Sequence, residues 1–167
     1  MSTGGRRLGT AMALLHASTK DPNRFENLIL ASAGHYAPYE VREILRNTPV
    51  ENIPAELMTA RLLFAVHGEE QVRTLHRNFR DFAAIYDDLN FTPPLLGIIA
   101  ARTLILHGDR DPQFPVELVM EMYRAIPNAS LWMVPNAGHS LLADDLPKFP
   151  GGDNFGAVAV EFLLNRF

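Results

Sequence analysis

Apolar residues along the chain form three short continuous runs. The runs lie near residues 27–31, 103–107 and 130–134, and loop-forming residues bound each of them. Runs of this length without alternating polar positions are typical of strands that are buried on both faces of a parallel sheet. We therefore predict three parallel strands, arranged in sequential order.

Helical spacing of apolar residues fills much of the chain between these runs. It is clearest from Glu69 onward, where the apolar positions are three, four, three and four residues apart: Val72, Leu75, Phe79, Phe82 and Tyr86. This spacing predicts one buried helix face. Another helix is expected between the second and third strands, over residues 116–126. Strands that alternate with helices indicate an α/β protein whose sheet is covered by helices.

Composition and charge exclude several classes of partner. With 167 residues, 47% of them hydrophobic, the chain is long enough for one domain with a substantial core. The formal net charge of −4 provides no basic surface for nucleic acid. No apolar run approaches the roughly 18 residues that span a bilayer. The chain has no cysteine, so disulfides and thiolate metal sites are excluded, and we expect a cytoplasmic protein with no membrane or nucleic-acid partner.

Candidate chemistry lies in the loops that follow the second and third strands. In open parallel sheets, functional groups gather beyond the carboxyl ends of the strands. Asp111 follows the second strand and His139 follows the third, while Ser2 precedes the first helix. Together they provide a Ser-Asp-His set. Asp109 competes with Asp111 for the acid position, and is otherwise expected to bond loop amides. Ser2 taken alone is better explained as a helix cap.

The remaining histidines show no pattern that points to a bound group. They are scattered, and no pair has the spacing of metal ligands: His16, His35, His67, His76 and His107. We interpret them as solvated or packing residues and predict no metal site and no cofactor.

Three segments of the chain resemble motifs of the α/β-hydrolase superfamily. Met1-Ser2-Thr3-Gly4-Gly5 resembles the nucleophile elbow without its first glycine. The segment from Leu104 to Pro115 resembles the acid-bearing strand and loop, and the segment from Val134 to His139 resembles the histidine loop. The order of Ser, Asp and His along the chain is that of the family. Within the superfamily the chain looks closest to the carboxylesterase and enol-lactonase-like branch.

This resemblance implies a fold and a reaction. Residues 1–35 and 101–167 would form the C-terminal part of the hydrolase core, and residues 36–100 a helical cap. The implied activity is hydrolysis of a small-molecule ester or lactone through an acyl-serine intermediate. C–C bond hydrolysis is the runner-up among enzyme activities.

The same resemblance assigns a role to each residue of the set. Ser2 would be the nucleophile and His139 its base, while Asp111 would orient the imidazole. The backbone N–H of Thr3 would be one donor of the oxyanion hole.

The resemblance also implies that part of the fold is missing. Members of the family have further strands before the nucleophile, whereas here one residue precedes Ser2. We therefore expect a partial fold of three parallel strands with flanking helices and a cap. The first strand would be an exposed sheet edge, which favours self-association or pairing with a partner. Impaired activity is expected, and the alternative is a non-catalytic remnant or a module that complements another chain.

Overall fold

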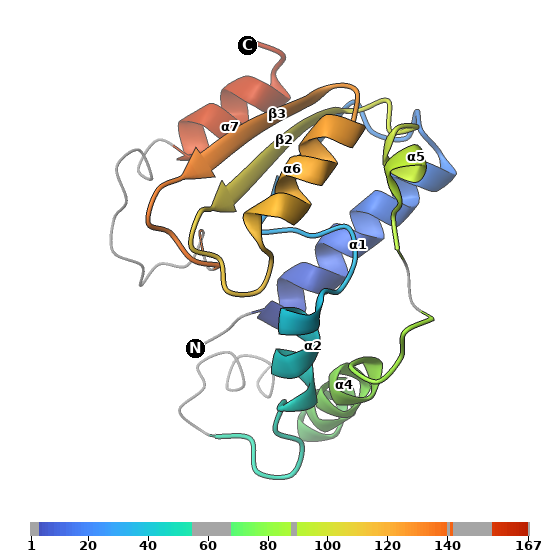
Figure 1. Cartoon of the computed structure of the whole chain (residues 1–167), viewed down its shortest axis with the longest axis vertical. Coiled ribbons are helices and arrows are strands. Elements are labelled where there is room, and N and C mark those ends of the chain that lie inside the picture. Colours follow the sequence, from blue (N-terminus) through green and yellow to red (C-terminus); the bar gives the residue numbers. More distant parts are fainter. Residues whose placement is uncertain (1–3, 55–67, 88–89, 140, 142–154, 167) are drawn as a thin grey trace.

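The computed structural model describes residues 4–54, 68–87, 90–139, 141 and 155–166, with side chains from Ala11 onward. Along the chain the elements follow the expected alternation of helices and strands (Figure 1): α1 (Gly4–Lys20), β1 (Asn27–Ala31), α2 (Tyr39–Arg46), α4 (Glu69–Phe82), α5 (Pro93–Leu96), β2 (Arg102–Gly108), α6 (Val116–Ala125), β3 (Ala129–Val134) and α7 (Phe155–Leu163). None of the described helices is both long and apolar enough to cross a bilayer.

The three strands form one parallel sheet in the order β1-β2-β3. Leu28 pairs with Thr103, and Leu104 pairs with Ser130. The predicted fold class is confirmed, and each strand lies within a residue of its predicted position. In the described part of the chain β1 is an edge of the sheet. Pairing of this edge with another chain stays a prediction.

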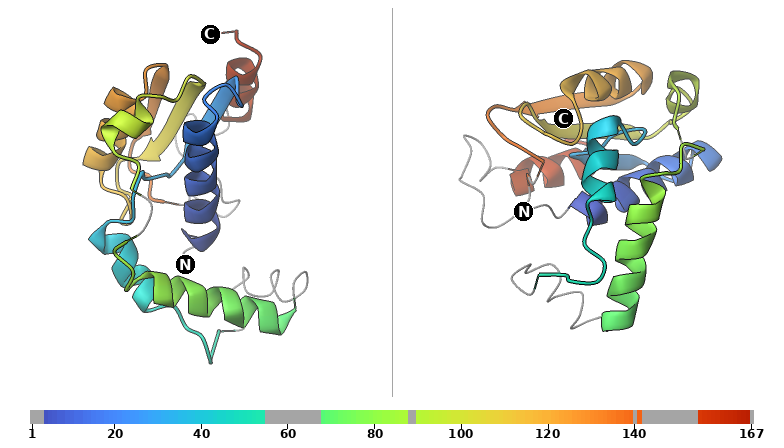
Figure 2. Two further views of the ribbon diagram at one scale, coloured as in Figure 1. Left: turned by 90° about the vertical axis from the view of Figure 1, so that its right-hand side faces the viewer. Right: turned by 60° about the horizontal axis from the view of Figure 1, so that its bottom comes forward.

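Helices cover both faces of the sheet. Successive residues of β2 point to opposite faces. Ile105 belongs to an apolar cluster with Leu15 of α1 and Met122 of α6, whereas Leu106 belongs to a second cluster against which Phe155 of α7 packs. Figure 2 shows α6 and α7 on opposite sides of the strands. This double cover explains why β2 reads as a continuous apolar run.

Helices α2 and α4 lie together beyond one end of the sheet (Figure 1). They share a third apolar cluster, in which Val41 and Leu45 of α2 meet Phe114 and Leu118 of the core. These helices lie within the region predicted to be a cap, and the division of the chain into core and cap stays a prediction. The cluster makes the core and this helical region continuous.

Helix α4 ends earlier than its apolar spacing predicted. Val72 is fully buried and Phe79 and Phe82 pack on the third cluster. Tyr86, by contrast, is 70% exposed, because the helix stops at Phe82 and the chain turns. Its ring lies instead over the Arg42 guanidinium, 4.4 Å from the ring centre.

Candidate active site

The loop after β2 holds the Asp111 carboxylate in a fixed position. One oxygen, Oδ1, accepts hydrogen bonds from the backbone N–H groups of Gln113 (2.8 Å) and Phe114 (3.2 Å). An aspartate that bonds the backbone two or three residues onward forms its own turn. The side chain is fully buried, so this local bonding replaces water around the carboxylate.

The loop after β3 carries His139 and lies directly against the acid loop. Two backbone bonds join them, from Asp109 N–H to the Val134 carbonyl (3.1 Å) and from Arg110 N–H to the Ala137 carbonyl (2.9 Å). Gly108 makes this approach possible, because a Cβ atom there would lie 2.2 Å from the Ala137 oxygen. The end of β2 therefore needs glycine for close packing.

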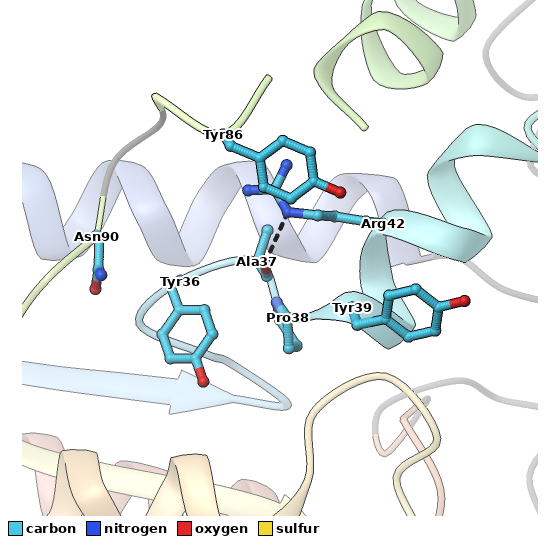
Figure 3. A pocket seen from close by; sticks show the side chains of 7 residues that line it. All are labelled: Tyr36, Ala37, Pro38, Tyr39, Arg42, Tyr86 and Asn90. Carbon is cyan, nitrogen blue, oxygen red and sulfur yellow. Dashed lines mark hydrogen bonds between the residues drawn. The ribbon is translucent and has the colours of Figure 1, made fainter. Parts of the chain in front are cut away.

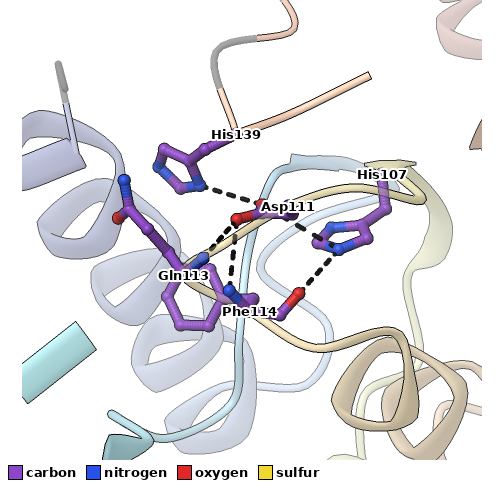
Figure 4. A network of polar contacts seen from close by, with 5 residues as sticks. All are labelled: His107, Asp111, Gln113, Phe114 and His139. Atoms are coloured by element: carbon purple, nitrogen blue, oxygen red, sulfur yellow. Dashed lines mark hydrogen bonds and ion pairs between the residues drawn. The ribbon is translucent and has the colours of Figure 1, made fainter. Parts of the chain in front are cut away.

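Asp111 and His139 meet where these loops join. The second carboxylate oxygen, Oδ2, lies 3.0 Å from Nδ1 of His139, and the predicted hydrogen bond between them is present (Figure 4). His139 is 5% exposed. Because a carboxylate can only accept, Nδ1 carries the proton in this bond. That tautomer leaves Nε2 as the nitrogen that can accept a proton.

The surroundings of Asp111 keep it ionised. Burial alone would raise the pKa of its carboxyl, but the hydrogen bond from His139 and the amides of Gln113 and Phe114 outweigh burial, so the pKa lies below its usual range. A buried negative charge beside an imidazole stabilises the imidazolium. The pair is therefore suited to general acid–base chemistry.

A second histidine, His107 of β2, lies on the other side of Asp111. Its Nε2 is 3.0 Å from the Phe114 carbonyl oxygen and 3.9 Å from Asp111 Oδ2. Burial lowers the pKa of its ring, more than the neighbouring carboxylate raises it. From the sequence, His107 is expected to be a solvated or packing residue. Its spacing of four residues from Asp111 was the signal available in the sequence.

The structure separates the two candidate acids. The amide bonds predicted for its side chain are not observed for Oδ1, which is buried and has no hydrogen-bond partner among the described residues. Asp109 contributes its backbone N–H to the loop junction, and the bond to His139 belongs to Asp111.

The predicted nucleophile region lies outside the described residues. Ser2 and Thr3 precede Gly4, where the described part of α1 begins. Their positions relative to the Asp111–His139 pair therefore stay predictions. Within the described ranges, no group of three or more histidine, cysteine or acidic side chains is arranged to hold a metal ion.

A separate cavity of about 290 Å³ opens near α2 (Figure 3). Its lining comes from the segment between β1 and α2, from α2 itself and from the segment between α4 and α5: Tyr36, Ala37, Pro38, Tyr39, Arg42, Tyr86 and Asn90. Neither Asp111 nor His139 lines it.

A family model and several solved structures match this chain. A family model described as TAP-like protein matches residues 92–146, which include the acid and histidine loops. No curated protein sequence matches the chain closely enough to count as a relative.

Solved structures of hydrolases resemble the chain over nearly its whole length. One is 2-hydroxy-6-oxo-6-phenylhexa-2,4-dienoate hydrolase from Rhodococcus sp. strain RHA1, with a TM-score of 0.64 and 20% identity over 98% of this chain and 62% of that one. A meta-cleavage product hydrolase from Pseudomonas fluorescens IP01 gives a TM-score of 0.60 and 17% identity, covering 92% and 61%. A thermophilic esterase from Thermogutta terrifontis gives 0.53 and 23%, covering 95% and 62%.

These similarities establish the fold. The chain spans 61% to 62% of the length of these three structures. The part that it shares with them is a three-stranded parallel sheet with helices on both faces. The chain therefore has an α/β-hydrolase fold, in partial form.

Proposed function

We propose that this chain belongs to a serine hydrolase that cleaves carboxylic esters or lactones, with a triad of Ser2, His139 and Asp111. The observation that supports the proposal most strongly is the 3.0 Å bond between Asp111 and His139. Both side chains are buried, and they follow neighbouring strands at the carboxyl end of the sheet. This is the place where open α/β sheets carry their functional groups.

The proposed reaction begins with a proton transfer from Ser2 to His139. A serine hydroxyl is a weak nucleophile until a base takes its proton. Nε2 of His139 would take that proton as the Ser2 oxygen attacks the carbonyl carbon of the substrate. Asp111 would stabilise the imidazolium that results. The imidazolium would then donate the proton to the leaving alkoxide, and an acyl-serine would remain.

The second half of the reaction reverses these roles. Water would lose a proton to Nε2 of His139 and attack the acyl-serine, and the proton would return to the Ser2 oxygen as it leaves. The backbone N–H of Thr3 would bind the oxyanion in both steps. No metal or cofactor takes part in this scheme.

The preference for ester or lactone substrates rests on the sequence resemblance. The structural neighbours include an esterase and enzymes described as meta-cleavage product hydrolases. C–C bond hydrolysis by the same triad is therefore the second candidate function. A non-catalytic module that complements another hydrolase chain is the alternative outside enzymes. The cap proposed over residues 36–100, which includes α2 and α4, would shape the substrate site.

The test compares hydrolysis of p-nitrophenyl butyrate by the chain and by three variants. We expect turnover that Ser2→Ala and His139→Ala both reduce to the uncatalysed rate. His16→Ala, which changes an exposed histidine of α1 outside both the proposed triad and the proposed cap, should leave the rate unchanged. A rate that survives Ser2→Ala would contradict the proposal.

A further inference from the structure

Two buried histidines face the same oxygen of one carboxylate. His139 Nδ1 lies 3.0 Å from Asp111 Oδ2, and His107 Nε2 lies 3.9 Å from that same atom. Figure 4 shows the two rings on opposite sides of Asp111. The side chain of His107 is fully buried, so water cannot separate it from the carboxylate. A second imidazole in this position is not part of the proposed proton transfers.

The proton on His107 can be located from its partner. Nε2 lies 3.0 Å from the carbonyl oxygen of Phe114, which can only accept a hydrogen bond. Nε2 therefore carries hydrogen. Nδ1 has no hydrogen-bond partner among the described residues. Burial favours the uncharged ring. His107 is therefore a neutral hydrogen-bond donor whose Nε2–H points at the Phe114 carbonyl and whose Nδ1 carries no proton.

The bond to Phe114 controls the geometry of the acid. Asp111 Oδ1 is held by the N–H groups of Gln113 and Phe114. The carbonyl of Phe114 is in turn held by His107, which belongs to the rigid central strand. His107 therefore anchors the peptide segment that aims two amides at the carboxylate.

We propose that His107 is a positioning residue for the acid of the triad: as a neutral ring it anchors the loop that orients Asp111, and it leaves the charge of Asp111 to His139. This inference rests on the proposed function. Asp111 and His139 are the charged or titratable groups that face His107 among the described residues. An imidazolium at position 107 would lie 3.9 Å from the carboxylate and would compete with His139 for its charge.

The proposal has a consequence at acid pH. In the neutral range His107 stays uncharged and Asp111 supports His139 alone. When the pH falls well below the ordinary histidine value of about 6.5, a second proton would enter the site on His107. Activity should therefore decline more steeply than with one proton, because an imidazolium at position 107 would draw on the charge that Asp111 supplies to His139.

Two substitutions separate the anchoring role from the titration. His107→Gln places an amide N–H close to the position of Nε2 but cannot titrate. His107→Leu removes the donor as well. His76→Gln is the matched control, since His76 also bonds a carbonyl, that of Pro49, from helix α4. We expect kcat of His107→Gln within about twofold of the parent chain. For His107→Leu we expect a kcat about 10- to 100-fold lower with little change in KM, because the acid is misplaced.

The closing experiment records ring nitrogen and downfield proton NMR spectra of these chains between pH 8 and pH 4. We expect His107 as the Nε2–H tautomer and a downfield Nδ1–H signal from His139. That signal should persist in His107→Gln and broaden or vanish in His107→Leu. In the pH profile of kcat/KM, the decline that is steeper than one proton should become a one-proton decline in His107→Gln and stay unchanged in His76→Gln.

These readouts distinguish failure of the inference from failure of the proposed function. The NMR signals do not require turnover, so they test His107 even in an inactive chain. An Nδ1–H tautomer for His107, or an unchanged His139 signal in folded His107→Leu, would overturn the inference. If His107→Leu does not fold, His107→Gln provides the test. In an active chain, a decline steeper than one proton that persists in His107→Gln overturns the inference. In an inactive chain, loss of the His139 Nδ1–H signal in His107→Gln overturns it.

Discussion

The backbone N–H of Arg110 donates a hydrogen bond of 2.9 Å to the carbonyl oxygen of Ala137, and this bond ties the acid loop to the histidine loop. Two loops that follow different strands are thereby held at a fixed separation. The side-chain bond between Asp111 and His139 depends on that separation, because it spans the same junction. The backbone contact makes the junction sensitive to any atom added at Gly108.

Gly108→Ala should open this junction. The added Cβ would meet the backbone of Ala137, which cannot rotate away as a flexible side chain can. We expect a loss of about 2–3 kcal/mol or more in the free energy of unfolding, measured by urea titration. Gly156→Ala is the control, since nothing lies within 4 Å of its Cβ position in α7. There alanine should be neutral or stabilise by about 0.5–1 kcal/mol. Equal effects at the two positions would contradict the packing argument.

Asp111→Asn should abolish most of the proposed hydrolysis. The amide keeps the size of the side chain but cannot stabilise an imidazolium or enforce the correct tautomer. Loss of kcat on the order of 10⁴-fold is expected for this change in a serine triad. Asp109→Asn provides a matched substitution two residues away, and its effect on kcat should be less than about threefold. If Asp109→Asn were the damaging change, the assignment of the acid would be wrong.

Stability should fall as the pH drops below the ordinary histidine range. Burial lowers the pKa of His35 and of His107. The unfolded chain therefore binds protons that the folded chain does not, beginning near pH 6.5. The free energy of unfolding should decrease from that pH toward the lower folded values and then level off for these groups. Urea titrations between pH 8 and pH 5 measure the effect.

Substitution of His35 should flatten that dependence. His35 Nδ1 donates to the Phe91 carbonyl (3.0 Å), and its Nε2 lies 3.3 Å from a carboxylate oxygen of Glu121. His35→Gln removes one of the two titrating rings, so the loss between pH 7 and pH 5 should shrink. His16→Gln, at an exposed position of α1, should leave the slope as it is. A slope unchanged by His35→Gln would show that its neutral form is not favoured by folding.

At pH values below the histidine range, part of the loss in the free energy of unfolding should come from protonation of Asp111. Its pKa is lowered in the folded chain, so the stability that it contributes is present above the ordinary value of about 3.8 and is lost as the pH falls from there toward the folded value. Asp111→Asn should remove this part of the acid dependence. Urea titrations between pH 5 and pH 3 test it, and an undiminished dependence in the variant would assign the effect to other carboxyl groups.

Arg42 should be important for joining α2 to the turn after α4. Its guanidinium donates to the carbonyls of Ala37, Phe82 and Ile85, and it lies beneath the ring of Tyr86. Lysine lacks the planar fork that serves several acceptors and stacks on a ring. We expect Arg42→Lys to lower the free energy of unfolding by about 1–3 kcal/mol.

The control for Arg42 lies on the same helix. Arg46 is exposed and pairs with Glu43, so Arg46→Lys should change stability by less than about 0.5 kcal/mol. Hydrogen exchange at the amides of residues 83–85 should accelerate in Arg42→Lys alone. Equal exchange in both variants would argue against a bridging role for Arg42.

The sheet and the acid–histidine pair were predictable for related reasons. Strands covered on both faces leave continuous apolar runs, as at Leu104–Leu106, and those runs are easily located. Parallel strands also bring their carboxyl ends to one edge. Asp111 and His139 were therefore expected at the same edge of the sheet although 28 positions separate them. The position of the two loops depends on geometry that any parallel sheet shares, whereas the pairing of the two side chains was predicted from the resemblance to α/β-hydrolases.

Other features depend on tertiary contacts that the spacing of apolar residues along the chain does not predict. Tyr86 continues the apolar period of α4, yet the helix ends at Phe82 and the ring stacks on Arg42. In the sequence, His107 is one polar residue in an apolar strand. The short distance between its ring and the Asp111 carboxylate depends on the path of the loop between the two residues. Amide bonds were expected for Asp109, yet its Oδ1 has no hydrogen-bond partner among the described residues, whereas Oδ1 of Asp111 accepts two amide bonds.

The most direct test of the central claim is covalent labelling of Ser2 by a fluorophosphonate, located by mass spectrometry of the digested chain. The reagent needs an activated serine but no leaving-group proton transfer or substrate fit, so it reports the triad itself. We predict an adduct on the peptide that contains Ser2, absent in His139→Ala and at least about 100-fold slower in Asp111→Asn. No adduct at Ser2 in the folded chain, or an adduct that forms at the same rate in His139→Ala, would contradict the account.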